Sequence, residues 1–213
     1  SHPKLLDWLA LYFRDQGGSF KKLNKLLVMS ASYQQSSAGN EEFARSDSGN
    51  RLLWRMNRRK LSAEEIRDAV LSVSGKLNLE MGGPGYYLFA LEKTAHSPHY
   101  EYHKFNPEDS KSHRRSIYRF IVRSQPNPFM TTLDCADSSQ STPKRNETLT
   151  ALQALSLLNN KFSVVMARHF ATRLEKEESD MARQVRRGHV LVTGRVPAKE
   201  EADLLLGYAR KHG

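Results

Sequence analysis

Residues 62–73, which read SAEEIRDAVLSV, predict the central helix of the fold. Ser62 and Glu65 have the spacing of a capping box, in which each side chain binds the free backbone N–H of the other residue. Apolar residues follow at positions 66, 69, 70 and 73 and predict one buried stripe along this helix. Gly75 is a residue type at which such a helix ends. We therefore expect a capped, amphipathic helix here.

The residues that precede this segment predict a helical hairpin followed by a loop. Pro3 suits the first turn of a helix, and Gly17-Gly18 suits its end. Ser19 can cap a second helix that continues to about Ser32. The polar stretch 34–50 is predicted to be an exposed loop, and 51–60 a short helix or turn.

The middle of the chain is predicted to be irregular. Residues 81–85 hold three glycines and a proline, and 86–113 is an irregular stretch rich in aromatic residues and histidine. The apolar pattern of 114–124 fits a buried helix or a strand, and we favour the helix over one short strand or hairpin. Residues 134–147 are predicted to be a polar loop.

Helices return in the last third of the chain, where apolar residues recur at helical spacing over 149–158, 162–178 and 180–193. A last helix is expected from Pro197, after Gly194. The predicted fold class is mainly all-α, an irregular multi-helix bundle with long loops. We expect a single helical domain over 1–213, excised from a larger multidomain protein because it begins without methionine.

Composition excludes several classes of protein. Hydrophobic residues make up 38% of the chain, but no apolar run approaches the ~20 residues that span a bilayer, so we expect no membrane insertion. The single cysteine, Cys135, excludes an intrachain disulfide and a haem-attaching Cys-x-x-Cys-His motif, so no cofactor is expected in this fragment. A net charge of +10 favours anionic partners such as acidic polysaccharide.

Eight segments, in the same order along the chain, resemble the planctomycete-specific domain one family. They are residues 1–10, 30–37, 50–59, 63–69, 81–85, 114–118, 145–155 and 193–197. The resemblance implies a domain of unknown function at the C-terminal end of large exported bacterial proteins that also carry a cytochrome-c-like domain. It therefore implies an exported location, periplasmic or at the cell surface, and haem elsewhere in the parent protein. The family has no established catalytic residues to transfer.

Three groups of residues are candidates for a site. His96, His99 and His103 share one irregular segment, and converging imidazoles bind transition metals. Because they follow no recognised ligand spacing, we favour exposed loop histidines and no metal. Guanidinium groups bind phosphate, sulfate or uronate. The candidates for such an anion site are Arg58, Arg59, Arg67, Arg114 and Arg115, although we favour an internal ion-pair network.

The polar loop before the most apolar helix holds the candidates for catalysis. Asp134 and Asp137 are close enough in sequence for acid–base chemistry, with Arg145 and Asn146 in the same loop. The alternative is that these side chains cap helices and turns. Both interpretations stay open on sequence alone.

These observations lead to three functional hypotheses. We favour a non-catalytic accessory domain that packs against other domains of the parent protein and contacts acidic glycans. The alternative is a polysaccharide-active enzyme domain with a site between residues 58–68 and 134–146. Nucleic-acid binding is third, because the charge has the right sign but no recognised binding motif accompanies it.

Overall fold

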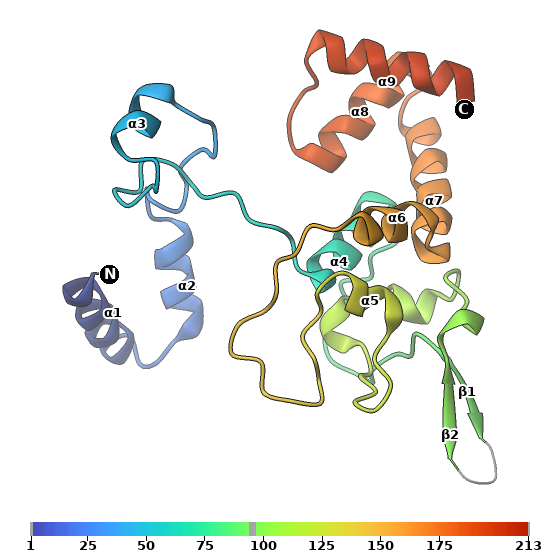
Figure 1. The fold of residues 1–213 in the computed structure, drawn as a ribbon, viewed down its shortest axis with the longest axis horizontal. Coiled ribbons are helices and arrows are strands. Elements are labelled where there is room, and N and C mark those ends of the chain that lie inside the picture. The colour runs from blue at the N-terminus through green and yellow to red at the C-terminus, as the bar shows by residue number, and fades with distance from the viewer. Residues whose placement is uncertain (1, 94–96, 213) are drawn as a thin grey trace. The chain divides into compact units, whose positions relative to one another are not determined.

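The computed structural model describes residues 2–93 and 97–212 (Figure 1). The chain divides into two compact units, Ser1–Lys60 and Leu61–Gly213. The described residues form nine α-helices and a single pair of antiparallel strands, so the predicted mainly helical fold class is confirmed.

The N-terminal unit begins with the predicted helical hairpin, made of α1 (Pro3–Asp15) and α2 (Phe20–Val28). Both glycines of the turn adopt the left-handed conformation at φ 70°, and the Ser19 hydroxyl accepts the Lys22 N–H as the cap of α2. The rings of Phe13 and Phe20 join the two helices at 5.0 Å. The expected extension of α2 to Ser32 is wrong, because Ser30 turns the chain by binding the Leu27 carbonyl.

The predicted exposed loop 34–50 contains one short helix, α3 (Glu41–Ser46). Asn40 caps it, and two glutamates lie in its first turn, where their negative charges interact favourably with the positive end of the helix dipole. The following stretch is a turn rather than a helix, because the Asp47 carboxylate accepts the backbone N–H groups of Arg51 and Leu52.

In the C-terminal unit, α4 (Ala63–Val73) has the predicted capping box of Ser62 and Glu65. Its buried face differs from the prediction. The residues that are fully buried are Ala63, Arg67 and Leu71, whereas the expected apolar stripe at 66, 69, 70 and 73 is half-buried. An arginine therefore lies at the centre of the buried face.

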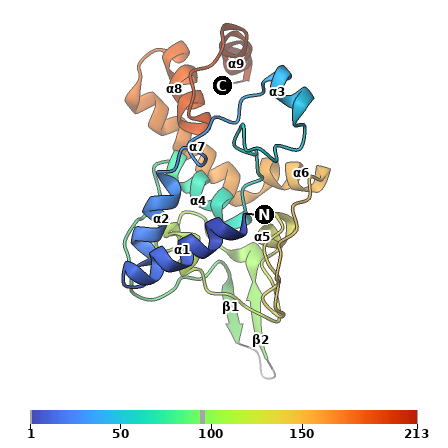
Figure 2. The ribbon, with the colours of Figure 1, turned by 90° about the vertical axis from the view of Figure 1, so that its left-hand side faces the viewer.

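The strand pair lies in the segment predicted to be irregular. β1 (Ala90–Lys93) and β2 (Pro98–Glu101) are antiparallel, with Ala90 opposite Glu101. Figures 1 and 2 both show this hairpin extending away from the helices of its unit. Three 3₁₀ turns follow, η1 (Tyr102–Lys104), η2 (Ser110–His113) and η3 (Ser116–Tyr118).

The helix favoured for 114–124 is wrong. Around η3 the chain is extended, and Arg114 and Arg119 form isolated bridges with Asn78 and Tyr86. Asp68 accepts both the backbone N–H and the hydroxyl of Ser116. Partners distant in sequence therefore satisfy backbone groups that a helix would pair internally, and the hairpin near 114–124 is also absent from the described residues.

One of the remaining helices precedes the polar loop 134–147 and four follow it. They are α5 (Pro128–Thr132), α6 (Ala151–Asn159), α7 (Lys161–Glu177), α8 (Met181–Thr193) and α9 (Lys199–His212). Gly194 ends α8 at φ 74°, as the sequence predicts. Helix α5 was not predicted, because Pro126 and Pro128 indicate the end of an element, whereas Pro128 is the first residue of this helix.

The core of the C-terminal unit gathers around α4. Ala63 packs with Met130 and Leu133, and Leu71 packs with Phe162 and Met166. Phe129 contacts both clusters, so α4 lies between α5 and α7. No helix in the described part of the chain is long and apolar enough to cross a membrane.

Candidate functional site

Arg67 is the centre of a polar network inside the C-terminal unit. The residue is only 1% exposed, and its side chain donates to the carbonyls of Arg114, at 3.0 Å, and of Ser112. Its guanidinium carbon lies 5.0 Å from the ring of Tyr86 and 5.4 Å from that of Phe162. Burial lowers the pKa of Arg67. The network joins α4 to η2 and to Arg114, which directly follows η2.

Arg114 organises the glycine-rich segment 81–85 in a similar way. Its Nη1 donates to the Pro84 carbonyl at 2.5 Å, and its Nη2 donates to the carbonyls of Gly82 and Glu80. The guanidinium carbon is 3.9 Å from the centre of the Tyr118 ring. Arg67 and Arg114 thus direct their donors at backbone carbonyls of the protein itself.

The other arginines of the predicted anion site have different surroundings. Arg115 is half-buried, and its Nε has no hydrogen-bond partner among the described residues. Arg58 and Arg59 belong to the N-terminal unit and are exposed, with Arg59 Nη1 donating to the Lys60 carbonyl at 3.4 Å. The network in the C-terminal unit therefore includes two of the five predicted arginines, Arg67 and Arg114, and anion binding by the set remains a prediction.

The predicted catalytic aspartates each hold their own loop. Asp134 adopts a left-handed φ of 64° and accepts the Thr148 N–H at 2.8 Å and the Gln153 amide at 3.1 Å. Asp137 accepts the backbone N–H and the hydroxyl of Ser139, at 2.8 and 2.7 Å. The first of these bonds is the main cause of the lowered pKa of Asp137. Each carboxylate thus accepts hydrogen bonds from its own loop or helix start, as in the capping alternative that the sequence left open.

Arg145 reaches from the same loop to α4, where its Nη1 donates to Glu64 at 2.5 Å. The Cys135 thiol lies 3.5 Å from the other oxygen of Glu64, and Arg119 Nη2 lies 3.6 Å from the sulfur. Burial raises the pKa of Cys135, and the Glu64 charge raises it further. These residues line a shallow groove, while Asn146 is exposed. The groove joins α4 to the loop before α6, and an enzyme site between these segments stays a prediction.

Of the histidines considered as metal ligands, His96 lies outside the described residues. His99 is exposed on β2, and His103 Nδ1 is 3.1 Å from the Glu101 carboxylate. The described residues hold no group of three side chains that is suited to a metal ion.

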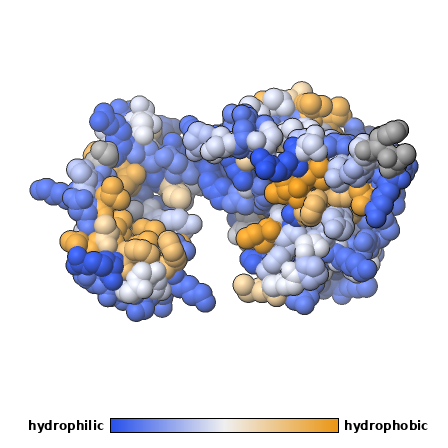
Figure 3. Space-filling view, turned by 90° about the horizontal axis from the view of Figure 1, so that it is seen from below, coloured by the Kyte–Doolittle hydropathy of each residue, from blue (hydrophilic) through white to orange (hydrophobic). Residues whose placement is uncertain are grey.

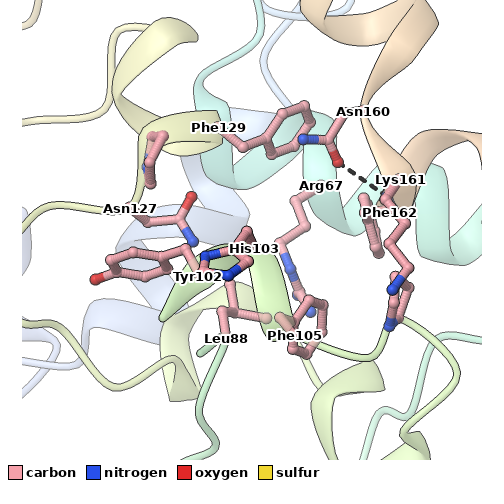
Figure 4. A pocket seen from close by; sticks show the side chains of 12 residues that line it. Arg67, Leu88, Tyr102, His103, Phe105, Asn127, Phe129, Asn160, Lys161 and Phe162 are labelled. Atoms are coloured by element: carbon pink, nitrogen blue, oxygen red, sulfur yellow. Dashed lines mark hydrogen bonds between the residues drawn. The ribbon is translucent and has the colours of Figure 1, made fainter. Parts of the chain in front are cut away.

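A cavity of about 270 Å³, which the sequence did not indicate, lies beside Arg67 (Figure 4). Leu88 and residues 102–107 meet there with Arg67 of α4, the start of α5 and the start of α7. Most of its walls are apolar, from Leu88, Phe105, Pro107, Pro128, Phe129 and Phe162, and its polar lining is Arg67, Tyr102, His103, Asn127, Asn160 and Lys161.

The fold and these contacts define a mainly helical, basic protein with an arginine-centred core and a cavity lined by aromatic residues. The chain belongs to the PSD1 family, a family of proteins of unknown function (DUF1553), whose model matches residues 1–209. The resemblance seen in the sequence is thereby confirmed. Neither the curated proteins nor the solved structures contain a match to this chain.

Proposed function

We propose that this chain is a non-catalytic interaction module that packs against another polypeptide through the leucines of α6. The carrying observation is that α6, the most apolar helix, buries only Gln153. Leu152, Leu155 and Leu158 are 63%, 53% and 73% exposed. A helix of an isolated globular protein normally turns its apolar side inward.

Polar contacts fix this inverted orientation of α6. The Gln153 amide nitrogen donates to Asp134 at 3.1 Å and to Thr148 at 2.9 Å, and its oxygen accepts the Thr150 N–H in a capping box. With Gln153 held inward, the three leucines at three-residue spacing face outward. Covering a leucine side chain fully contributes about 1.5–3 kcal/mol. A partner surface would recover that free energy.

The N-terminal unit supports the same proposal. Within residues 2–60, the structure has Asn50 as the one buried residue. Large apolar side chains such as Leu6, Trp8 and Phe20 are exposed, and Figure 3 shows apolar residues gathered on the surface of each unit. A unit this small needs buried apolar area to be stable. Its helices therefore need an apolar surface outside these residues.

The partner that we favour is another domain of a longer, exported protein, with any haem carried by that domain. Membership of a family without a known activity is compatible with an accessory role. The charge of +10 favours an additional contact with acidic polysaccharide, which long-range electrostatics would strengthen at low salt.

A photo-crosslinking amino acid in place of Leu155 tests the proposal in the natural host. We expect crosslinks from position 155 to a segment of the same gene product outside residues 1–213. Position 168 on α7, an exposed arginine, is the matched control and should give none. The variant with Leu152→Gln and Leu158→Gln should keep its helical circular dichroism and lose the crosslink. Crosslinks confined to residues 1–213 would exclude this docking role.

A further inference from the structure

The cavity beside Arg67 is lined by basic side chains and by no acidic ones. The basic residues are Arg67, Lys161 and His103, the last with its Nδ1 3.1 Å from the Glu101 carboxylate. The guanidinium of Arg67 is occupied by carbonyls and lies 3.7 Å from the Asp68 carboxylate, so Arg67 acts here only through the part of its charge that this ion pair leaves. Lys161 is exposed at the edge of the cavity and makes no ion pair within the described residues. The electrostatic potential in the cavity therefore favours an anion.

Two asparagines add donors whose orientation the structure fixes. The Asn127 side-chain oxygen accepts the Met130 N–H at 3.1 Å, and that of Asn160 accepts the Phe162 N–H at 2.9 Å. Because each oxygen caps a helix, each Nδ2 must point elsewhere. Neither Nδ2 makes a hydrogen bond to another described residue. Figure 4 shows both side chains, with His103 and Arg67, around the same space.

The walls are suited to a flat ring. Phe129 and Phe162 pack against each other with ring centres 6.1 Å apart, and together with Phe105 and Leu88 they form an apolar surface of the cavity. Aromatic side chains bind other rings by offset or edge-to-face contact. A volume of about 270 Å³ is below the ~300–1,000 Å³ of pockets that hold drug-sized molecules. The cavity therefore fits a ligand of one or two rings.

From these three features we infer that the cavity binds a small aromatic carboxylate. Its ring lies among the phenylalanines, and its carboxylate accepts hydrogen bonds from Lys161 and from an asparagine amide. The positive end of α7, a helix of 17 residues, adds to the attraction for the negative charge. This site is separate from the leucine face of α6.

Benzoate and its neutral isostere benzamide are the probes that separate charge recognition from simple apolar binding. We expect benzoate to bind with a dissociation constant of about 1 mM, as for a ligand of few heavy atoms. Benzamide should bind at least about tenfold more weakly, since it lacks the charge. Chemical-shift changes in NMR spectra of the whole chain should map to Phe129, Phe162 and Asn160.

The variant Asn160→Asp tests the site without removing a helix cap. Aspartate caps a helix as well as asparagine does, and its charge suits a helix N-terminus, so folding should be preserved. A carboxylate in the cavity should weaken benzoate binding about tenfold or more. Thr150→Asp is the matched control, because it adds the same charge at the cap of α6, outside the cavity lining, and should leave binding unchanged.

Several results would overturn the inference. Two concern affinity: equal binding of benzoate and benzamide, or an unchanged benzoate affinity in Asn160→Asp. Two others are chemical-shift changes that map away from the cavity, and no binding at benzoate concentrations several times the expected dissociation constant. Tighter binding of glucuronate than of benzoate would also overturn it, because a uronate lacks the aromatic ring that the walls fit.

Discussion

The carboxylate of Glu64 and the guanidinium of Arg145 are joined at 2.5 Å, although the two residues are 81 positions apart in sequence. This contact holds the loop before α6 against the first turn of α4. Burial is the largest single influence and raises the pKa of Glu64, but the hydrogen bond from Arg145, the Arg145 charge and the hydrogen bonds from the backbone and Cys135 together outweigh it, so the pKa is lowered. The contact therefore holds the loop in place only while the Glu64 carboxyl is ionised.

Removing this contact with Arg145→Gln should destabilise the protein slightly and in a pH-dependent way. Because Arg145 is 44% exposed in its side chain, solvent screening limits the loss to about 1 kcal/mol or less. A carboxyl with a pKa below its unfolded value of 4.5 contributes above that pH, and the contribution disappears as the pH falls through the folded pKa. Urea unfolding should show a larger difference from wild type at pH 7 than at pH 3. Equal differences at both pH values would contradict this prediction.

Helix ends could be predicted because their signals are local. The hydroxyl of Ser62 meets a backbone group three residues away, and Gly194 needs only its own left-handed φ. The extended course of 114–124 could not be predicted, because its stabilising partners, Asp68 and Tyr86, are remote in sequence. The spacing of apolar residues along the chain does not show which remote residues will contact a segment.

The same dependence on remote partners explains which contacts of the site were not predicted. Arg67 was a candidate for anion binding, yet its carbonyl partners lie 45 and 47 residues away. The dipeptide Asn127-Pro128 is a recognisable helix start, so the cap at α5 could have been found from sequence. That Asn127 and Asn160 meet at one cavity depends on tertiary packing and has no sequence signal.

Replacing Arg67 with methionine should be strongly destabilising even though the new side chain is apolar. The carbonyls of Ser112 and Arg114 would lose their donor while remaining buried, which costs about 1–3 kcal/mol per group. We expect a loss of about 2–5 kcal/mol in urea unfolding. Arg168→Met on α7, at an exposed position, is the control and should change stability by less than about 0.5 kcal/mol. Similar values for the two variants would contradict the role given to Arg67.

Asp134 should tolerate asparagine better than alanine. Its left-handed φ of 64° is accessible to asparagine and costly for alanine, and its carboxylate accepts hydrogen bonds from Thr148 and Gln153. Alanine should cost about 2–3 kcal/mol of unfolding free energy and asparagine about 1 kcal/mol. Asp137→Asn, whose partners stay within its own exposed turn, is the control and should have a smaller effect than either. The test is whether the loss of unfolding free energy is largest for Asp134→Ala, smaller for Asp134→Asn and smallest for Asp137→Asn.

Two glycine-to-alanine changes should have opposite signs. A Cβ at Gly85 would lie 2.9 Å from the backbone oxygen of Tyr118 and would push apart the bridge in which Tyr86 donates to that oxygen at 3.1 Å. We expect Gly85→Ala to lose about 1–3 kcal/mol, as overpacking against backbone does. Gly207 lies inside α9 with nothing within 4 Å of an added Cβ, so Gly207→Ala should gain up to about 1 kcal/mol of helix stability. Thermal unfolding of both variants beside wild type checks the two signs. A stabilising Gly85→Ala would mean that the segment before Tyr86 does not approach Tyr118 as closely as the structure shows.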